Sequence, residues 1–424
     1  MAVYKDRIKL LIQNIMKKIL FFSCIAAALL SFVGCEETGN DYEGTNYIYL
    51  ESEGGKTTIL GTSDGPITVN VNLTKALSED LTLDFVVEGP QNALTVAGNP
   101  VTIKAGEKTA SFTIAVSTIE GLSDITNYTV GLDASEQLPE KVVLEAGFSF
   151  VVVAIEIPEL TTDQLAIVEA YKTATGIDLS KYLGVVNVST VITGIDPVTE
   201  EDLEPKTVNG VSVITLSETS TAEVPVLKMI ANPMGIQDYM YENLKRVTVE
   251  NTEYWFGEYS LPSYNTLMQE IDWTSESAEV FSMTLDGIKL NGNAISFLGE
   301  FTPVVVEIPT EEEDETVEEN PEIYVHVPFA YSFSAYDREL AAIADGTLIR
   351  DADWAYDATA NPAYHLNNTC VTEEYAEEEL STDGYWIEAE ATISEDAIVF
   401  TFCSYVNEND YDYTRFVATY TPNN

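Results

Sequence analysis

The feature that most constrains the fold is a period of two in the apolar residues of the first third of the chain. Between Ile67 and Leu73, apolar side chains alternate with Thr and Asn. Successive side chains of a strand point to opposite faces of a sheet, so this alternation indicates a strand with one buried and one solvated face. The same pattern returns, between Gly, Pro, Asn or Asp turns, in 81–87, 112–116, 128–132 and 148–152. We therefore predict a sandwich of antiparallel sheets over residues 47–157.

One segment of this region has a familiar order of residues. The stretch "PVTIKAGEKTASFTIAV" (Pro100–Val116) resembles the strand, Gly-Glu turn and strand of Calx-beta-like domains, which are of the immunoglobulin type. The resemblance implies an immunoglobulin-like sandwich of the kind found near the start of Bacteroidota surface lipoproteins. Calcium-binding members carry an acidic cluster after the second strand, whereas this chain reads "STIEG" at Ser117–Gly121. The resemblance therefore does not extend to calcium binding by this domain.

The rest of the chain, residues 158–424, has one clear helix signal and many strand signals. Thr161 and Gln164 have the spacing of a capping box, and Gly176 suits the end of the helix. A second short helix is predicted over 337–344. The expected strands are 211–216, 247–250, 281–285, 323–333, 385–393, 397–405 and 414–420. We predict one larger β-rich domain, a sandwich or barrel-like sheet, with the first helix packed at its entrance.

The stretch "LTTDQLAIVEAYKTATGIDLSKYLG", which contains this helix, resembles the opening of a second domain in uncharacterised Bacteroidota lipoproteins. Some of those are described as nutrient-binding proteins of the outer membrane. The resemblance implies a location and a fold more than an activity.

The N-terminal segment has the layout of an export signal. Lys17 and Lys18 precede an apolar run over 19–33, which is short for a membrane-spanning anchor, the alternative interpretation. The order Phe32-Val33-Gly34-Cys35 resembles a bacterial lipobox, which implies a lipid on Cys35 and removal of residues 1–34. Met16 is then the expected start of the protein, and residues 35–46 are a flexible tether.

The residues that follow Cys35 refine the expected location. Glu36 and Glu37 resemble the Bacteroidota signal for export to the outer face of the outer membrane, although they also suit the start of an acidic linker. We therefore expect a protein held at the cell surface by its lipid alone.

The charge and the apolar content limit the partners. A formal net charge of −50 repels nucleic acid and anionic head groups. A hydrophobic content of 45% is enough to form packed cores, so the chain is not a disordered acidic polymer. The most acidic block, 307–322, is predicted to be a solvated loop.

The sequence lacks the motifs of common catalytic sites. There is no G-x-S-x-G elbow, no H-E-x-x-H and no C-x-x-C, and the chain has only two histidines, His326 and His365. We expect a protein that is not an enzyme and has no cofactor, with calcium as the alternative. Oxygen-rich turns supply the calcium candidates Asp351, Asp353, Asp357, Asp410 and Asp412.

Two cysteines, Cys370 and Cys403, would remain beside Cys35 after cleavage. In an exported protein such a pair is a disulfide candidate, and two reduced, buried thiols are the alternative.

Aromatic residues beside acids supply the candidates for ligand binding. In "GYWIEAEATI" the period of two places Trp386, Glu388 and Glu390 on the polar face of a strand. A ring beside carboxylates can stack on a sugar while the acids accept hydrogen bonds from hydroxyls. Tyr254 and Trp255 are further candidates, although no period shows which ring faces out and core packing is the favoured role for them; Trp354 and Tyr411 are weaker candidates.

The function expected from these patterns is binding of a glycan or other nutrient by a surface lipoprotein. An adhesion or envelope-assembly protein, with a partner such as an outer-membrane transporter, is the alternative. A glycoside hydrolase is the third interpretation, since paired carboxylates are abundant in the chain.

Overall fold

The computed structural model describes residues 44–257, 262–301, 324–349, 358–366, 369–370, 386–407 and 412–423. The export signal, Cys35 and the acidic block 307–322 lie outside the described residues. As predicted, the protein is mainly β, with an N-terminal sandwich and a larger barrel domain.

The N-terminal sandwich is built on the predicted alternation. In β3 (Ile67–Leu73) the residues Ile67, Val69 and Val71 are all fully buried. Antiparallel neighbours join it in the order β1-β3-β8-β6, and the facing sheet has the order β2-β11-β9-β5 with a parallel β2–β11 pair. The other strands are β1 (Asn46–Ser52), β2 (Thr58–Leu60), β4 (Leu81–Leu83), β5 (Phe85–Glu88), β6 (Leu94–Ala97), β7 (Val101–Ile103), β8 (Thr109–Val116), β9 (Ile125–Leu132), β10 (Val142–Leu144) and β11 (Phe148–Val153).

The helix α2 (Thr162–Thr175) begins and ends where the sequence predicts. The Thr161 hydroxyl accepts a hydrogen bond from the Gln164 backbone N–H at 3.2 Å, and the Gln164 side chain accepts one from the Thr161 N–H at 2.9 Å. Gly176 follows in the left-handed conformation with φ 83°. The Tyr171 hydroxyl donates to the Gly292 carbonyl at 2.6 Å, which fixes α2 to one end of the second domain.

The second domain is a closed barrel of antiparallel strands that follow one another in chain order. Its sheet runs β14-β13-β12-β23-β22-β21-β16-β15, and β14 also pairs with β15, so eight strands of the described chain close the ring. They are β12 (Gly184–Gly194), β13 (Lys206–Leu216), β14 (Val226–Ala231), β15 (Phe281–Asn291), β16 (Ala294–Ser296), β21 (Glu390–Ile393), β22 (Ile398–Asn407) and β23 (Asp412–Thr421). β19 (Phe329–Phe333) adds to β15, and a small sheet contains β17 (Gly299–Phe301), β18 (Tyr324–His326) and β20 (Thr369–Cys370).

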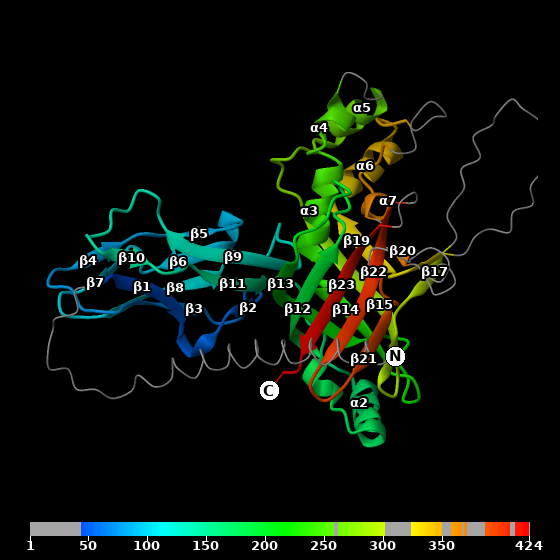
Figure 1. Ribbon diagram of the computed structural model, residues 1–424, viewed down its shortest axis with the longest axis horizontal. Coiled ribbons are helices and arrows are strands. Elements are labelled where there is room, and N and C mark those ends of the chain that lie inside the picture. The colour runs from blue at the N-terminus through cyan, green and yellow to red at the C-terminus, as the bar shows by residue number, and fades with distance from the viewer. Residues whose placement is uncertain are drawn as a thin grey trace, which may run out of the picture. The chain divides into compact units, whose positions relative to one another are not determined.

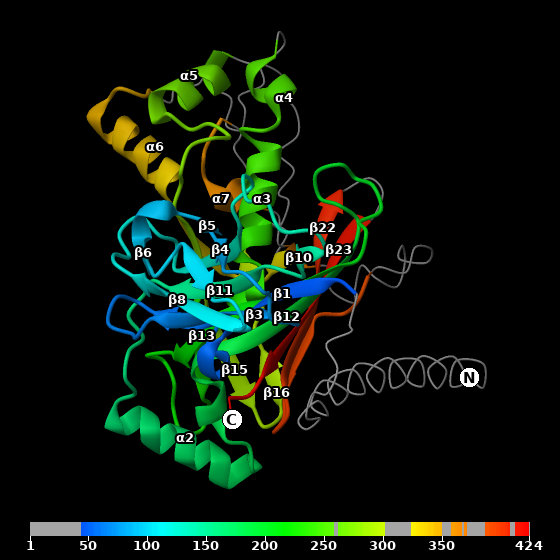
Figure 2. The ribbon, with the colours of Figure 1, turned by 90° about the vertical axis from the view of Figure 1, so that its left-hand side faces the viewer.

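Most helices of this domain gather at one end of the barrel. Figure 1 and Figure 2 both place them at the end opposite to α2. They are α3 (Gln237–Val247), α4 (Thr252–Phe256), α5 (Pro262–Ile271), α6 (Ser334–Asp345) and α7 (Pro362–His365). Among the described residues, none of the helices combines the length and apolar character that a membrane span requires.

Three local predictions for this domain need correction, and one is confirmed. The α6 helix confirms the helix expected over 337–344. The strand expected over 247–250 is wrong, because Val247 ends α3, whose apolar residues recur at helical spacing. The segment 323–333 breaks at Pro328, which has no N–H to donate to a ladder. The strand expected over 385–393 is shorter than predicted, because its hydrogen-bonded part, β21, begins only at Glu390.

A polar turn at the end of β14 fills the centre of the barrel. The Met234 N–H donates to the Tyr420 hydroxyl at 2.8 Å, and Ser212 Oγ lies 3.1 Å from that hydroxyl and donates to the Asn232 carbonyl at 2.5 Å. Tyr420 is completely buried. The turn therefore depends on hydrogen bonds from β13 and β23 that no water can replace.

The backbone of this turn is unusual. Asn232 and Met234 both have positive φ, 46° and 57°, which costs free energy in residues other than glycine. Gly235 has φ 69°, and a Cβ there would lie 2.7 Å from a methyl group of Val188. The surrounding barrel wall therefore holds the turn in a conformation that it would not keep alone, and this turn sets the start of α3.

We predict that Tyr420→Phe lowers the free energy of unfolding of the barrel by about 2 kcal/mol, since it leaves the buried Met234 N–H without its acceptor. Urea unfolding followed by tryptophan fluorescence measures this, because all four tryptophans follow residue 158. Tyr182→Phe is the control, since it removes a single bond to the Ser394 carbonyl, with an expected loss of about 1 kcal/mol. Equal losses in the two variants would contradict a special role for the turn.

Candidate functional site

The predicted strip around Trp386 is only partly as expected. Glu388 and Glu390 are exposed, and the alternation over β21 is confirmed by the buried Ala391 and Ile393. Trp386 is half-buried and precedes the strand, so it is not the open platform that the period of two predicted. The Ile387 N–H donates to Cys403 Sγ at 3.2 Å, which holds this stretch against β22.

Trp255 does not face a ligand but packs in the core, the role that its sequence context favoured over ligand binding. Its side chain is 1% exposed on α4, and its indole N–H donates to the Val247 carbonyl at 2.8 Å. Its ring packs against Tyr264 with centroids 4.6 Å apart. The apolar residues around Trp255 follow neither a strand nor a helix period, so the sequence did not predict the short helix α4, in which the ring points inward.

The other predicted residues lie outside the described part of the chain. These are Cys35, Trp354, Tyr411, Asp351, Asp353, Asp357 and Asp410, together with the side chains of Tyr254 and Asp412. In the residues that are described, no group of three His, Cys, Asp or Glu side chains has the arrangement of a metal site.

Cys370 and Cys403 carry no disulfide and are both buried. The disulfide predicted from the sequence is therefore not formed in this structure, and the alternative of two reduced thiols describes it. Burial raises the pKa of the Cys403 thiol to about 11. Burial, aided by the nearby Cys403, raises the pKa of Cys370 to about 12, so both thiols are protonated and poorly reactive at neutral pH.

The described residues form a hollow at the helical end of the barrel. It has a volume of about 160 Å³ and lies among α3, α7, the turn after β12 and the last residues of β22. Its polar walls are Tyr239, Asn243, His365, Ser404 and Thr414, and Phe416 adds an aromatic surface. No sequence motif marks this grouping, because its members come from five separate segments.

The barrel wall of the hollow follows from strand alternation. In β22 the side chains of Phe402 and Ser404 point inward, and in β23 those of Thr414 and Phe416 do the same. Ser404 and Thr414 are direct cross-strand partners. The Thr414 hydroxyl donates to the Ile195 carbonyl at 2.6 Å, so the strand end is fixed to the turn that forms another wall.

The helical wall contains a buried hydroxyl that lacks a hydrogen-bond partner among the described residues. Tyr239 and Asn243 lie one helical turn apart on α3 and both face the hollow. Tyr239 is 6% exposed, and its hydroxyl finds no partner in hydrogen-bonding geometry within the described ranges. Burial raises the pKa of Tyr239, and the neighbouring Asn243 side chain offsets part of that rise. The phenol is therefore neutral at physiological pH and able to bond a group in the hollow.

An ion pair fixes Asn243 from behind. The two Nη atoms of Arg246 donate to the two carboxylate oxygens of Asp196 at 2.9 and 3.0 Å, and Nη1 also donates to Asn243 Oδ1 at 3.2 Å. Burial alone would raise the pKa of Asp196, but the bonds from Arg246 and from two backbone N–H groups outweigh it and lower that pKa. The Asn243 oxygen is thus occupied, which leaves its NH₂ group as the donor toward the hollow.

The third wall comes from α7. His365 Nε2 lies 2.7 Å from the Thr359 carbonyl, which can only accept, so this nitrogen carries the proton in the neutral ring. The segment before α7 is held by Glu339 of α6, which is fully buried and accepts a hydrogen bond from the Ala360 N–H at 2.6 Å. The position of His365 therefore depends on where α6 lies.

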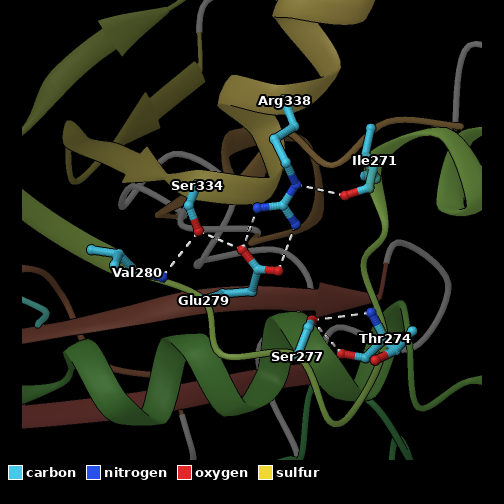
Figure 3. Close-up of polar contacts among 7 residues, drawn as sticks. All are labelled: Ile271, Thr274, Ser277, Glu279, Val280, Ser334 and Arg338. Atoms are coloured by element: carbon cyan, nitrogen blue, oxygen red, sulfur yellow. Dashed lines mark hydrogen bonds and ion pairs between the residues drawn. The ribbon is translucent and has the colours of Figure 1, made fainter. Parts of the chain in front are cut away.

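An ion pair with one buried partner, Glu279, fixes the position of α6 (Figure 3). Arg338 donates from two nitrogens to Glu279 at 2.6 and 2.9 Å and from Nε to the Ile271 carbonyl at 2.5 Å. The Ser334 hydroxyl also donates to Glu279. The Glu279 side chain is only 2% exposed. Its bidentate pair with Arg338 therefore fixes the start of α6 to the residues just before β15, where the Val280 N–H also donates to the Ser334 hydroxyl.

This pair makes stability depend on pH. Burial alone would raise the pKa of Glu279, but the bonds from Arg338, Ser334 and Ser277 outweigh it and lower that pKa. A carboxyl with a lowered folded-state pKa stabilises the fold above its unfolded pKa of about 4.3, and this contribution is lost as the pH falls through the folded value.

We predict that Glu279→Gln lowers stability at pH 7 by about 2 kcal/mol, less than the 3–5 kcal/mol of a fully buried pair, because the Arg338 side chain is 40% exposed. The difference in Tm from the unmodified protein should shrink as the pH is lowered from 5 to 3. The exposed Glu250, which pairs with Lys245 at 3.5 Å, supplies the control Glu250→Gln with little change at any pH. A Glu279→Gln effect that stays constant down to pH 3 would contradict this account.

Comparison with known families agrees with a division into two regions. Residues 158–421 match the family described as "Domain of unknown function (DUF8472)", and residues 42–152 match "Domain of unknown function (DUF4929)". The first match covers more than half of the chain, so the protein belongs to the DUF8472 family. No curated protein matches the chain.

Proposed function

We propose that this member of the DUF8472 family is a cell-surface lipoprotein that binds a glycan or another nutrient without acting on it. The observation that carries the proposal is the buried, unsatisfied hydroxyl of Tyr239 in the wall of the hollow. A buried polar group without a partner costs about 1–3 kcal/mol, and a ligand or water that bonds it recovers this cost.

The size of the hollow supports a small binding group. Its 160 Å³ is below the roughly 300–1,000 Å³ of pockets that enclose whole ligands. It equals about five water volumes at roughly 30 Å³ each, which suits a single small ring. The proposed ligand therefore inserts one terminal unit and continues outside.

The chemistry of the walls supports a sugar ring. Phe416 adds an aromatic, apolar part to the wall, while Tyr239 and Asn243 offer neutral polar groups one helical turn apart. Sugars combine apolar C–H faces with hydroxyls that both donate and accept, so both kinds of wall have a counterpart.

The strip predicted from the sequence is held against β22, the strand that also supplies Ser404 to the hollow. The Ile387 N–H bonds Cys403, and the next residue along β22, Ser404, lines the hollow. The exposed Glu388 and Glu390 follow in the same stretch. We propose that further units of a bound chain contact these acids and Trp386.

We predict that Tyr239→Phe weakens binding of the best ligand about tenfold with little change in Tm, since among the described residues this hydroxyl has no partner in hydrogen-bonding geometry. A glycan array identifies the ligand, and calorimetric titration of the purified protein measures the affinity. The control is Tyr331→Phe, which removes another buried, unsatisfied hydroxyl, on β19 and away from the hollow. Equal affinities of the two variants would contradict the hollow as the binding site. A glycan array without any binding would favour a protein partner instead.

The proposed location rests on Cys35, and its substitution tests it. We predict that Cys35→Ala abolishes incorporation of a labelled fatty acid and moves the protein out of the membrane fraction, because the lipid would be its only anchor. Cys24→Ala is the matched control, since this cysteine lies in the segment expected to be removed. Labelling that persists in Cys35→Ala, or is absent from the unmodified protein, would contradict the lipid anchor.

A further inference from the structure

The walls of the hollow carry no uncompensated charge among the described residues, in a protein of strongly acidic character. Tyr239, Asn243, Ser404 and Thr414 are neutral, and the His365 ring donates to a carbonyl. The formal net charge of −50 gives the whole molecule a field that repels anions. An anionic ligand would therefore need a local cation to enter.

The guanidinium bonded to the wall residue Asn243 is already neutralised. Arg246 lies one hydrogen bond behind the wall, bonded to Asn243, and both of its Nη atoms are engaged by Asp196. The two side chains are 27% and 14% exposed, so water screens the pair only in part. A carboxylate in the hollow would meet the negative charge of Asp196 together with the positive charge of Arg246, and would lose its own hydration.

A second cation, Lys206, lies near the Tyr239 ring. Its Nζ is 5.6 Å from the centre of the Tyr239 ring and 3.8 Å from a carboxylate oxygen of Glu242. These two side chains are 48% and 58% exposed, so solvent screens the lysine and the glutamate alike. Lys206 therefore gives an anion little help inside the hollow.

From this arrangement we infer that the hollow selects a neutral, hydroxyl-bearing sugar ring over one that carries a carboxylate, and that Asp196 sets this choice by neutralising Arg246. The inference rests on the proposed function and names the ligand class for the same site. Asp196 is a positioning residue, since it acts on the ligand through Arg246 and Asn243.

Paired sugars that differ only at C6 test the inference. The purified full-length protein is titrated with albumin that displays glucose or glucuronate, and galactose or galacturonate. We expect the protein to bind at least one neutral sugar about tenfold more tightly than its matched uronate. Asp196→Asn keeps the oxygen that accepts from the Val198 and Thr199 N–H groups but removes the charge, so the released Arg246 should bring the two affinities within about threefold.

Two further variants separate this effect from a change in net charge or in folding. Asp178→Asn removes the same charge at the opposite end of the barrel, where Asp178 pairs with Lys172 at 2.6 Å, and should leave the preference unchanged. Arg246→Gln leaves Asp196 without its cation and should widen the preference for the neutral sugar. The two substitutions in the Asp196–Arg246 pair thus move the ratio in opposite directions, which a general loss of structure does not do.

The measured affinities for the four sugars decide between the inference and its alternatives. A protein that binds the uronate as tightly as the neutral sugar overturns the inference, while the proposed binding function stands. An Asp196→Asn variant that binds the neutral sugar with an unchanged ratio also overturns it. If none of the four sugars binds, and the glycan array is blank as well, the proposed function fails and the inference fails with it.

Discussion

The interaction on which the rest of the barrel domain depends is the buried contact between Tyr420 and the turn Asn232–Ile236. The turn holds three residues with positive φ, and its hydrogen bonds with Tyr420 and Ser212 keep it inside the barrel. Because α3 starts directly after this turn, the direction of the helix is fixed by the strands beneath it. The positions of Tyr239 and Asn243, in the first and second turns of α3, follow from that constraint.

The candidate site shows how a packed barrel can still present a small recognition surface. Barrels of about eight strands have interiors that side chains fill or that hold one small ligand. Here Met234 and aromatic side chains such as Phe400 fill the centre, and the hollow is confined to the helical end. Two ion pairs support its walls, Arg246–Asp196 behind α3 and Arg338–Glu279 under α6. The two ion pairs thus hold the walls in place, while the residues that line the hollow are themselves neutral.

The sequence predicted the fold class well and the site poorly, for physical reasons. Strand alternation and the capping box at Thr161 are local signals, and the structure confirms both. Whether a strand closes a barrel depends on pairs such as β14 with β15, which lie far apart in the chain. The hollow joins residues from 197 to 416 and has no local motif. The helical spacing of Tyr239, Asn243 and Val247 was the one available signal, and the strand propensity of the following valines obscured it.

The central claim is that the hollow beside Tyr239 is where a ligand binds, and a crystal structure with the tightest-binding neutral sugar tests it most directly. The account predicts one ring in the hollow against Phe416, with a ligand oxygen about 2.7–3.0 Å from the Tyr239 hydroxyl. A sugar that binds elsewhere on the protein, with only water next to Tyr239, would contradict it.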